Sequence, residues 1–234
     1  MTLDSLKALV SPADLAALVL VALVWFGLGW RIERDGTAKP SVTVLVAQYR
    51  REWLRQFVTR QPRMYDASVL SSLRQSTNWL ASTTLLALGG LLALIGNPEQ
   101  LRGVAQDLAL DAPTPRAFET RLLLAGLFLS HGFLKFLWSN RLFGYSAIIM
   151  STVPNDPGDP LAYPRAAQSA EINIRAAYNF NRGLRATYFA LAALAWLLGP
   201  WALMAATLVV GWLIWSREFA SHSRAVLLDP PPEG

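Results

Sequence analysis

An uncharged run from Trp79 to Ile95 follows a polar segment with no helix-breaking residue between them. A run of this length is close to what a helix needs to cross the hydrocarbon core of a bilayer. Lipid offers the backbone no hydrogen bonds, so a helix is the only continuous conformation that the run can adopt there. The sequence therefore predicts a membrane protein.

The polar residues before this run are expected to belong to the same helix. Pro62 ends the preceding segment, and the next helix is predicted over Met64–Ile95. At 1.5 Å per residue it is about 48 Å long, well beyond the roughly 30 Å hydrocarbon core. Its first four turns are therefore expected to stand in the cytoplasm. There Asp66 lies beside Arg60 and Arg63, and we expect a salt bridge that holds a cytoplasmic helical layer together.

Small and hydroxyl residues are concentrated in this span: Ala81, Ser82, Thr83, Thr84, Ala87, Gly89 and Gly90. Such residues let another helix backbone approach closely, and hydroxyls hydrogen-bond across the contact. Ordinary helix packing is the interpretation that we favour. The alternative is a polar seam that lines a path through the membrane, with Asn78 at its mouth.

The last apolar run, Ala186–Trp215, is interrupted by Gly199 and Pro200. Glycine just after a helix end and proline at the start of the next helix are typical of a stop followed by a new start. A hairpin also places Trp196 and Trp201 at one membrane interface. The predicted fold is therefore an all-α polytopic transmembrane helical bundle, with five spans favoured and four as the alternative. The spans are expected at about 13–30, 79–96, 121–140, 185–199 and 200–216, within a single membrane domain over residues 1–234.

The first span carries the signals of a helix start. Ser11 is a good N-cap, Pro12 tolerates the first helical position, and Asp14 suits the first turn. Arg31 and Arg34 follow the span, and positive residues favour the cytoplasmic side. The sequence thus predicts a bacterial inner (plasma) membrane protein with a periplasmic N-terminus, large basic cytoplasmic loops and an acidic periplasmic loop over residues 97–120.

Residues 42–60 are predicted to form an amphipathic helix. Its apolar residues recur at helical spacing, and the charged residues lie between them: Arg50, Arg51, Glu52, Arg55 and Arg60. We expect this helix to lie along the anionic headgroups of the cytoplasmic leaflet. Arginines interleaved with aromatic residues also occur in nucleic-acid sites. The excess of positive residues that is usual on the cytoplasmic side of a membrane protein already explains these arginines, so no nucleic-acid partner is expected. The apolar positions are Val42, Val46, Tyr49, Trp53 and Phe57.

A second polar stem is expected to lead into a span after the Pro-rich cytoplasmic loop Ser151–Pro164. Its helix is predicted over 166–198. Asn181, Arg182 and Arg185 on this stem are candidates either to bind a partner or to satisfy the facing stem at Asp66. The candidate cytoplasmic interaction layer consists of Arg60, Arg63, Asp66, Asn181, Arg182 and Arg185. Residues 229–234 are predicted to form a disordered tail.

The third span contains Ser130, His131 and Lys135. A buried ionisable residue in a span is a functional candidate, because its desolvation is costly. Lys135 is near the cytoplasmic end and can extend to the interface. For His131 we favour a hydrogen-bonded packing role over a proton, ion or haem role. The candidate intramembrane polar path consists of Asn78, Ser82, Thr83, Ser130, His131 and Lys135.

No enzyme motif is present in the sequence. Cysteine is absent and there are only two histidines, His131 and His222. The chain has no Gly-rich phosphate loop, no GxSxG, no HExxH and no pair of carboxylates within a span. We therefore expect no catalytic residues, no metal site and no cofactor.

The two stem-and-span units carry a family resemblance. It rests on Trp53, Arg60, Arg63, Asp66, Leu73, the Ala81-Ser82-Thr83-Thr84 run with Gly89-Gly90, and on Asn181, Gly183, Arg185, Tyr188, Phe189, Trp196 and Pro200. With these residues the chain resembles the uncharacterised membrane-protein family named domain of unknown function five-nine-nine, found in bacteria and plants. Trp79 stands where phenylalanine is expected. The resemblance covers nearly the whole chain and implies fold and location, without an activity.

Three functions are compatible with these sequence features. The first is a non-catalytic interaction or scaffold protein, an accessory subunit that binds a membrane-protein partner or forms a homo-oligomer. The second is a small-solute or ion transporter or channel, which requires a hydrated cavity that reaches His131. The third is a redox-complex subunit that binds haem or quinone through His131. We favour the first because the spans contain so little polarity.

Overall fold

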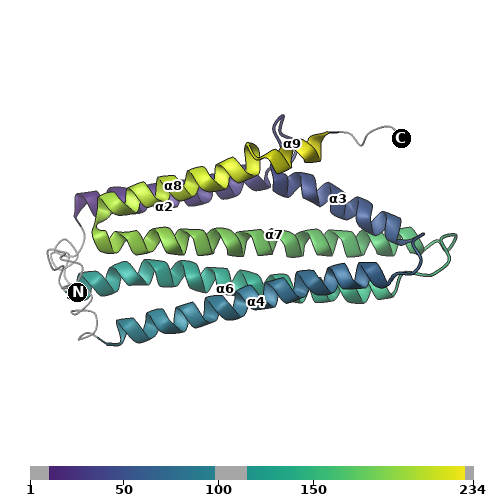
Figure 1. Cartoon of the computed structure of the whole chain (residues 1–234), viewed down its shortest axis with the longest axis horizontal. Helices are drawn as coiled ribbons and strands as arrows, with labels where there is room; N and C mark the ends of the chain where they lie inside the picture. The colour runs from purple at the N-terminus through teal and green to yellow at the C-terminus, as the bar shows by residue number, and fades with distance from the viewer. Residues whose placement is uncertain (1–10, 98–114, 230–234) are drawn as a thin grey trace. The chain divides into compact units, whose positions relative to one another are not determined.

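The structure is a computed structural model that describes residues 11–97 and 115–229. Within these ranges the chain forms helices joined by turns, with no strand, which confirms the predicted all-α class (Figure 1). The acidic loop predicted at 97–120 lies largely outside the described residues, as does the tail beyond Asp229. The helices are α2 (Pro12–Glu33), α3 (Val42–Phe57), α4 (Met64–Ile95), α6 (Pro115–Ser151), α7 (Ala162–Leu194), the 3-10 turn η1 (Ala195–Leu198), α8 (Pro200–Phe219) and α9 (His222–Leu228).

Four segments among the described residues are long and apolar enough to cross a membrane. They are Pro12–Glu33, Met64–Ile95, Ala117–Ser151 and Pro200–Leu228. The expected span at 185–199 is not one of them. The charged residues of α7 continue as far as Arg185, and the short apolar end that follows passes into η1 after Leu194.

The helix boundaries follow local sequence signals. The α4 helix has the predicted bounds, and Gly199, with φ +111°, separates η1 from the proline that begins α8. At the start of α2 the Asp14 amide donates to the Ser11 hydroxyl at 3.1 Å, while the Ser11 amide donates to the Asp14 carboxylate at 3.0 Å. One boundary was predicted wrongly. Pro164 lies inside the first turn of α7, where a missing N–H breaks no intrahelical bond.

The chain divides into two compact units. The first contains Met1–Trp30, Thr83–Gly132 and Leu184–Trp215, and we call it the apolar unit. The second contains Arg31–Ser82, Phe133–Gly183 and Ser216–Gly234, and we call it the polar unit. Most of the described basic residues belong to the polar unit.

Aromatic side chains pack against one another in the apolar unit. Trp25 meets Phe128 and Phe189 edge-on, with ring centroids 5.1 Å away in each case. The rings of Phe128 and Phe189 are 5.6 Å apart. Near the ends of its helices, Trp196 donates to Asp14 through its indole N–H at 2.6 Å. This bond ties η1 to the first turn of α2 and satisfies two polar groups that are both buried.

The core of the polar unit combines apolar side chains with buried serines. Leu54, Phe57, Leu70 and Phe143 are all buried in one cluster. Ser139 donates to the Ala176 carbonyl at 2.8 Å, so α6 and α7 are joined by polar bonds as well as by packing. Further along, the hydroxyls of two buried serines, Ser146 and Ser169, lie 3.0 Å apart.

Candidate functional site

The turn between α3 and α4 is organised around Asp66. Its side chain is fully buried, while that of Arg60 is 36% exposed, and the two form an ion pair through Asp66 Oδ1. The indole N–H of Trp53 donates to the same oxygen at 2.6 Å. The expected salt bridge with Arg60 is therefore present. Oδ2 of Asp66 is buried without a hydrogen-bond partner.

Arg63 was expected beside Asp66 but binds elsewhere. Its guanidinium donates to the carbonyls of Val153 at 2.9 Å and Pro154 at 2.8 Å, and to Val58 at 3.1 Å. It also lies 4.5 Å from the ring centre of Phe57. The planar fork of arginine suits several acceptors at once. Arg63 thus joins the end of α3 to the loop between α6 and α7.

Two of the α7 residues of the predicted interaction layer, Asn181 and Arg182, bind other partners than Asp66. Asn181 donates to the Thr43 hydroxyl at 3.2 Å. Arg182 Nε donates to both carboxylate oxygens of Glu33, at 3.0 and 3.1 Å. These hydrogen bonds raise the pKa of Arg182. Arg185 is buried and belongs to the apolar unit.

The residues of the predicted polar path are divided between the two units. Asn78, Ser82 and Lys135 belong to the polar unit, and Thr83, Ser130 and His131 to the apolar unit. Asn78, Ser82, Thr83 and His131 are exposed on the chain, while Ser130 and Lys135 are half-buried. His131 meets the ring of Trp25 edge-on at 5.5 Å. The path stays a prediction.

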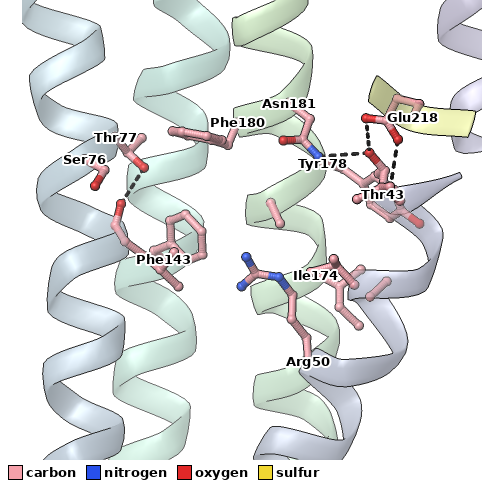
Figure 2. Close-up of a pocket in the computed structure, with 15 residues that line it drawn as sticks. Thr43, Arg50, Ser76, Thr77, Phe143, Ile174, Tyr178, Phe180, Asn181 and Glu218 are labelled. Carbon is pink, nitrogen blue, oxygen red and sulfur yellow. Dashed lines mark hydrogen bonds between the residues drawn. The ribbon is translucent and has the colours of Figure 1, made fainter. Parts of the chain in front are cut away.

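A cavity of about 260 Å³ lies in the polar unit, between residues of α3, α4, α6, α7 and α8 (Figure 2). At one side of it, Glu218 accepts from the Thr43 amide at 3.0 Å and from the Thr43 hydroxyl at 2.9 Å. Figure 2 draws the two hydrogen bonds between Thr43 and Glu218 and the one from Asn181 to Thr43. Arg50 takes part in none of them. The lining is mainly apolar. It consists of Val42, Thr43, Val46, Ala47, Arg50, Leu73, Ser76, Thr77, Phe143, Ile174, Ala177, Tyr178, Phe180, Asn181 and Glu218.

Arg50 is the cation of this cavity. It donates to the side-chain oxygen of Asn173 and lies 5.9 Å from the ring centre of Phe143. Its Nε is buried and has no hydrogen-bond partner. Burial lowers the pKa of Arg50 to about 10, so the group remains a cation at neutral pH. The arrangement can accept an oxyanion, because a desolvated guanidinium gains more from an anionic partner than an exposed one does.

A wider groove of about 970 Å³ lies along the polar turns of α4. Arg63, Arg74 and Arg165 contribute to it, together with Phe57 and apolar side chains of α6. Arg165 also donates to the Thr152 carbonyl at 2.6 Å. In the part of the chain that the structure describes, no group of three or more His, Asp and Glu residues is placed to hold a metal ion.

The family model described as "Protein of unknown function, DUF599" matches residues 16–223. The chain belongs to this family. The match confirms the resemblance seen in the sequence and includes α3, α4, α7 and every residue of the Arg50 cavity. No curated protein and no solved structure matches the chain.

Sequence reasoning missed the Arg50 cavity in this DUF599 chain. Arg50 was assigned to the polar side of the helix together with Arg51. The spacing contained a signal, because Arg50 follows Val46 and Val42 by one and two turns and so shares their side of α3. By contrast Arg51, next along the chain, is exposed and pairs with Glu171 at 2.7 Å.

Proposed function

We propose that this protein is an integral, multi-pass protein of the bacterial inner membrane with a non-catalytic interaction or scaffold role. It binds a second copy of itself or a membrane-protein partner through its spans. The polar unit forms the cytoplasmic helical layer of the resulting assembly. The proposal is supported by the four apolar segments and, above all, by the exposed surface of one of them.

That surface is the small-residue face of α4, formed by Thr83, Ala87 and Gly90. These residues are one turn apart, so they lie on the same side of the helix, and all three are exposed on the chain. A Cβ built on Gly90 would have no atom within 4 Å. In lipid, small side chains add little dispersion contact of their own, but they allow a second helix to come close. This exposed face is the observation that supports the interaction function best.

The polar contacts of the other unit also favour this function. Arg60, Arg63 and Arg182 bind a carboxylate or backbone carbonyls of the same unit. Guanidinium groups that are held by such intramolecular bonds stabilise the shape of a surface and are not available for a reaction. A fixed helical layer of this kind suits a protein that positions a partner.

The experiment that tests the proposal is Gly90→Leu, which makes the face bulky without adding polarity. Gly27→Leu on α2 is the matched control, since Gly27 is also exposed with no atom within 4 Å of an added Cβ. On native gels of gently extracted membranes, Gly90→Leu is expected to lose the assembly that wild type and Gly27→Leu retain. Equal assembly of all three proteins would contradict the proposal.

The same proposal includes a topology of five spans with the N-terminus in the periplasm. The apolar end of α7 and η1 form the fourth span, and α8 returns to the cytoplasm from Gly199. The chain contains no cysteine, so single-cysteine variants can report on each side. A membrane-impermeant maleimide is expected to label Asn97→Cys in intact cells. It is expected to label Asn155→Cys only after permeabilisation, and the reverse pattern would contradict the orientation.

A further inference from the structure

We propose that the Arg50 cavity is a binding site for a small amphipathic monoanion, that is, one carboxylate or phosphate group attached to an apolar body. The oxyanion pairs with the Arg50 guanidinium, and the apolar body packs against the aromatic and aliphatic lining. This goes beyond the interaction function, which requires no ligand. The proposal rests on the charge, the lining and the size of the cavity.

The charge of Arg50 lacks an acidic partner. Among the described residues, its hydrogen-bond partner is the neutral amide of Asn173, and no carboxylate lies within ion-pair distance of it. Three other arginines of α3 and the turn after it, Arg51, Arg55 and Arg60, each pair with a carboxylate. Removing a cation from water costs free energy, and an anionic partner is needed to offset that cost. A bound oxyanion would provide the missing partner and accept from the free Nε–H.

The side chains that line the cavity favour a ligand whose oxyanion is attached to an apolar group. The side chains of Val46, Leu73, Phe143, Ile174 and Phe180 face the cavity. Its volume of about 260 Å³ lies just below the range typical of sites for drug-sized ligands, roughly 300–1,000 Å³. A ligand smaller than a typical drug molecule fits this space. An inorganic anion alone would leave most of the apolar lining without contacts.

Glu218 limits the ligand to a single negative charge. Its carboxylate lines the same cavity and is held by both hydrogen bonds from Thr43. A second anionic group on the ligand would be repelled by Glu218 in this low-dielectric setting. A neutral or weakly polar end facing Thr43 and Asn181 is compatible with the lining.

The test uses the purified full-length protein and benzoate as the probe, with benzamide as its uncharged counterpart. Benzoate is expected to raise the melting temperature in a concentration-dependent way, because it binds the folded state. Benzamide is expected to have no such effect. Arg50→Gln is expected to weaken benzoate binding by roughly tenfold to a hundredfold, the range for losing a charged hydrogen-bond partner.

Two further variants separate binding from folding. Ala177→Leu fills the cavity while Arg50 stays in place, and it is expected to abolish the benzoate effect. Arg51→Gln removes a neighbouring exposed arginine and is expected to bind as wild type. Benzoate binding that survives both Arg50→Gln and Ala177→Leu would overturn the proposal, as would equal stabilisation by benzamide.

The natural oxyanion has two possible sources, a soluble carboxylate and an anionic phospholipid. Native mass spectrometry of the protein from nanodiscs that contain phosphatidylglycerol distinguishes them. Phosphatidylglycerol that stays bound to wild type and is lost in Arg50→Gln identifies the lipid as the source. Benzoate binding without retained phosphatidylglycerol identifies a soluble carboxylate. Absence of both would refute the site.

Discussion

The indole N–H of Trp53 and the carboxylate of Asp66 are 13 positions apart in the chain and 2.6 Å apart in space. The bond crosses the turn between α3 and α4 and reaches a carboxylate that is fully buried. Together with the Arg60 ion pair, it fixes the angle at which the polar turns of α4 leave α3. Substitutions at either end of this contact are expected to lower stability.

Asp66→Asn is expected to lower the free energy of unfolding by on the order of 1–3 kcal/mol. The amide can still accept from Trp53, but Arg60 loses the only carboxylate it contacts among the described residues. Thermal denaturation followed by circular dichroism in one detergent measures the change. Glu52→Gln is the control, because it makes the same chemical change at an exposed pair, 3.8 Å from Arg55. Equal melting temperatures for both variants would contradict a stabilising role for the buried pair.

Trp53→Phe is expected to cost about 1 kcal/mol for the lost hydrogen bond, in addition to a small packing loss. In the double variant with Asp66→Asn the two effects are expected to be less than additive, because the residues share one contact. The same denaturation experiment supplies the four values of the cycle. Full additivity would mean that the indole and the carboxylate act independently, contrary to the 2.6 Å contact.

Arg63→Lys is expected to loosen the loop between α6 and α7 while the charge is kept. A lysine lacks the planar fork that reaches the carbonyls of Val153, Pro154 and Val58. Hydrogen exchange of residues 152–161 is expected to be faster than in wild type. Arg74→Lys in the same groove serves as the control and is expected to leave that exchange unchanged. Unchanged exchange in Arg63→Lys would show that the three bonds do not order the loop.

Gly183→Ala is expected to destabilise the fold by about 1–3 kcal/mol. An added Cβ would lie 2.7 Å from the buried ring of Phe136, so the ring or one of the two helices must shift. Gly27→Ala places a methyl group in open space and is expected to be neutral or to gain up to about 1 kcal/mol from helix propensity. Melting temperatures of the two variants in parallel check the difference. A stable Gly183→Ala protein would contradict the close packing.

Local signals in the sequence predicted several of the helix boundaries. Ser11 and Pro12 predicted the start of α2, and Gly199-Pro200 predicted the break before α8, because capping and proline chemistry depend on a few adjacent residues. The bounds of α4 followed from an unbroken run after Pro62. The start of α7 was misplaced since proline is compatible with a first turn as well as with a loop.

The partners of individual polar residues were harder to predict. Arg60 and Arg63 are three positions apart, yet Arg60 pairs with Asp66 and Arg63 binds the carbonyls of Val153 and Pro154. Asn181 likewise binds Thr43 rather than Asp66. These choices depend on how helices distant in sequence pack together, which no local pattern contains. The Arg50 cavity arises in the same way, from residues of five helices.

Native mass spectrometry of the protein, extracted gently from its own membrane, reports directly on the interaction function. The interaction function predicts that wild type arrives as a homo-oligomer or with a stoichiometric protein partner. It also predicts that Gly90→Leu arrives alone, while Gly27→Leu behaves as wild type. Wild type that arrives only as a monomer without a protein partner would contradict the claim.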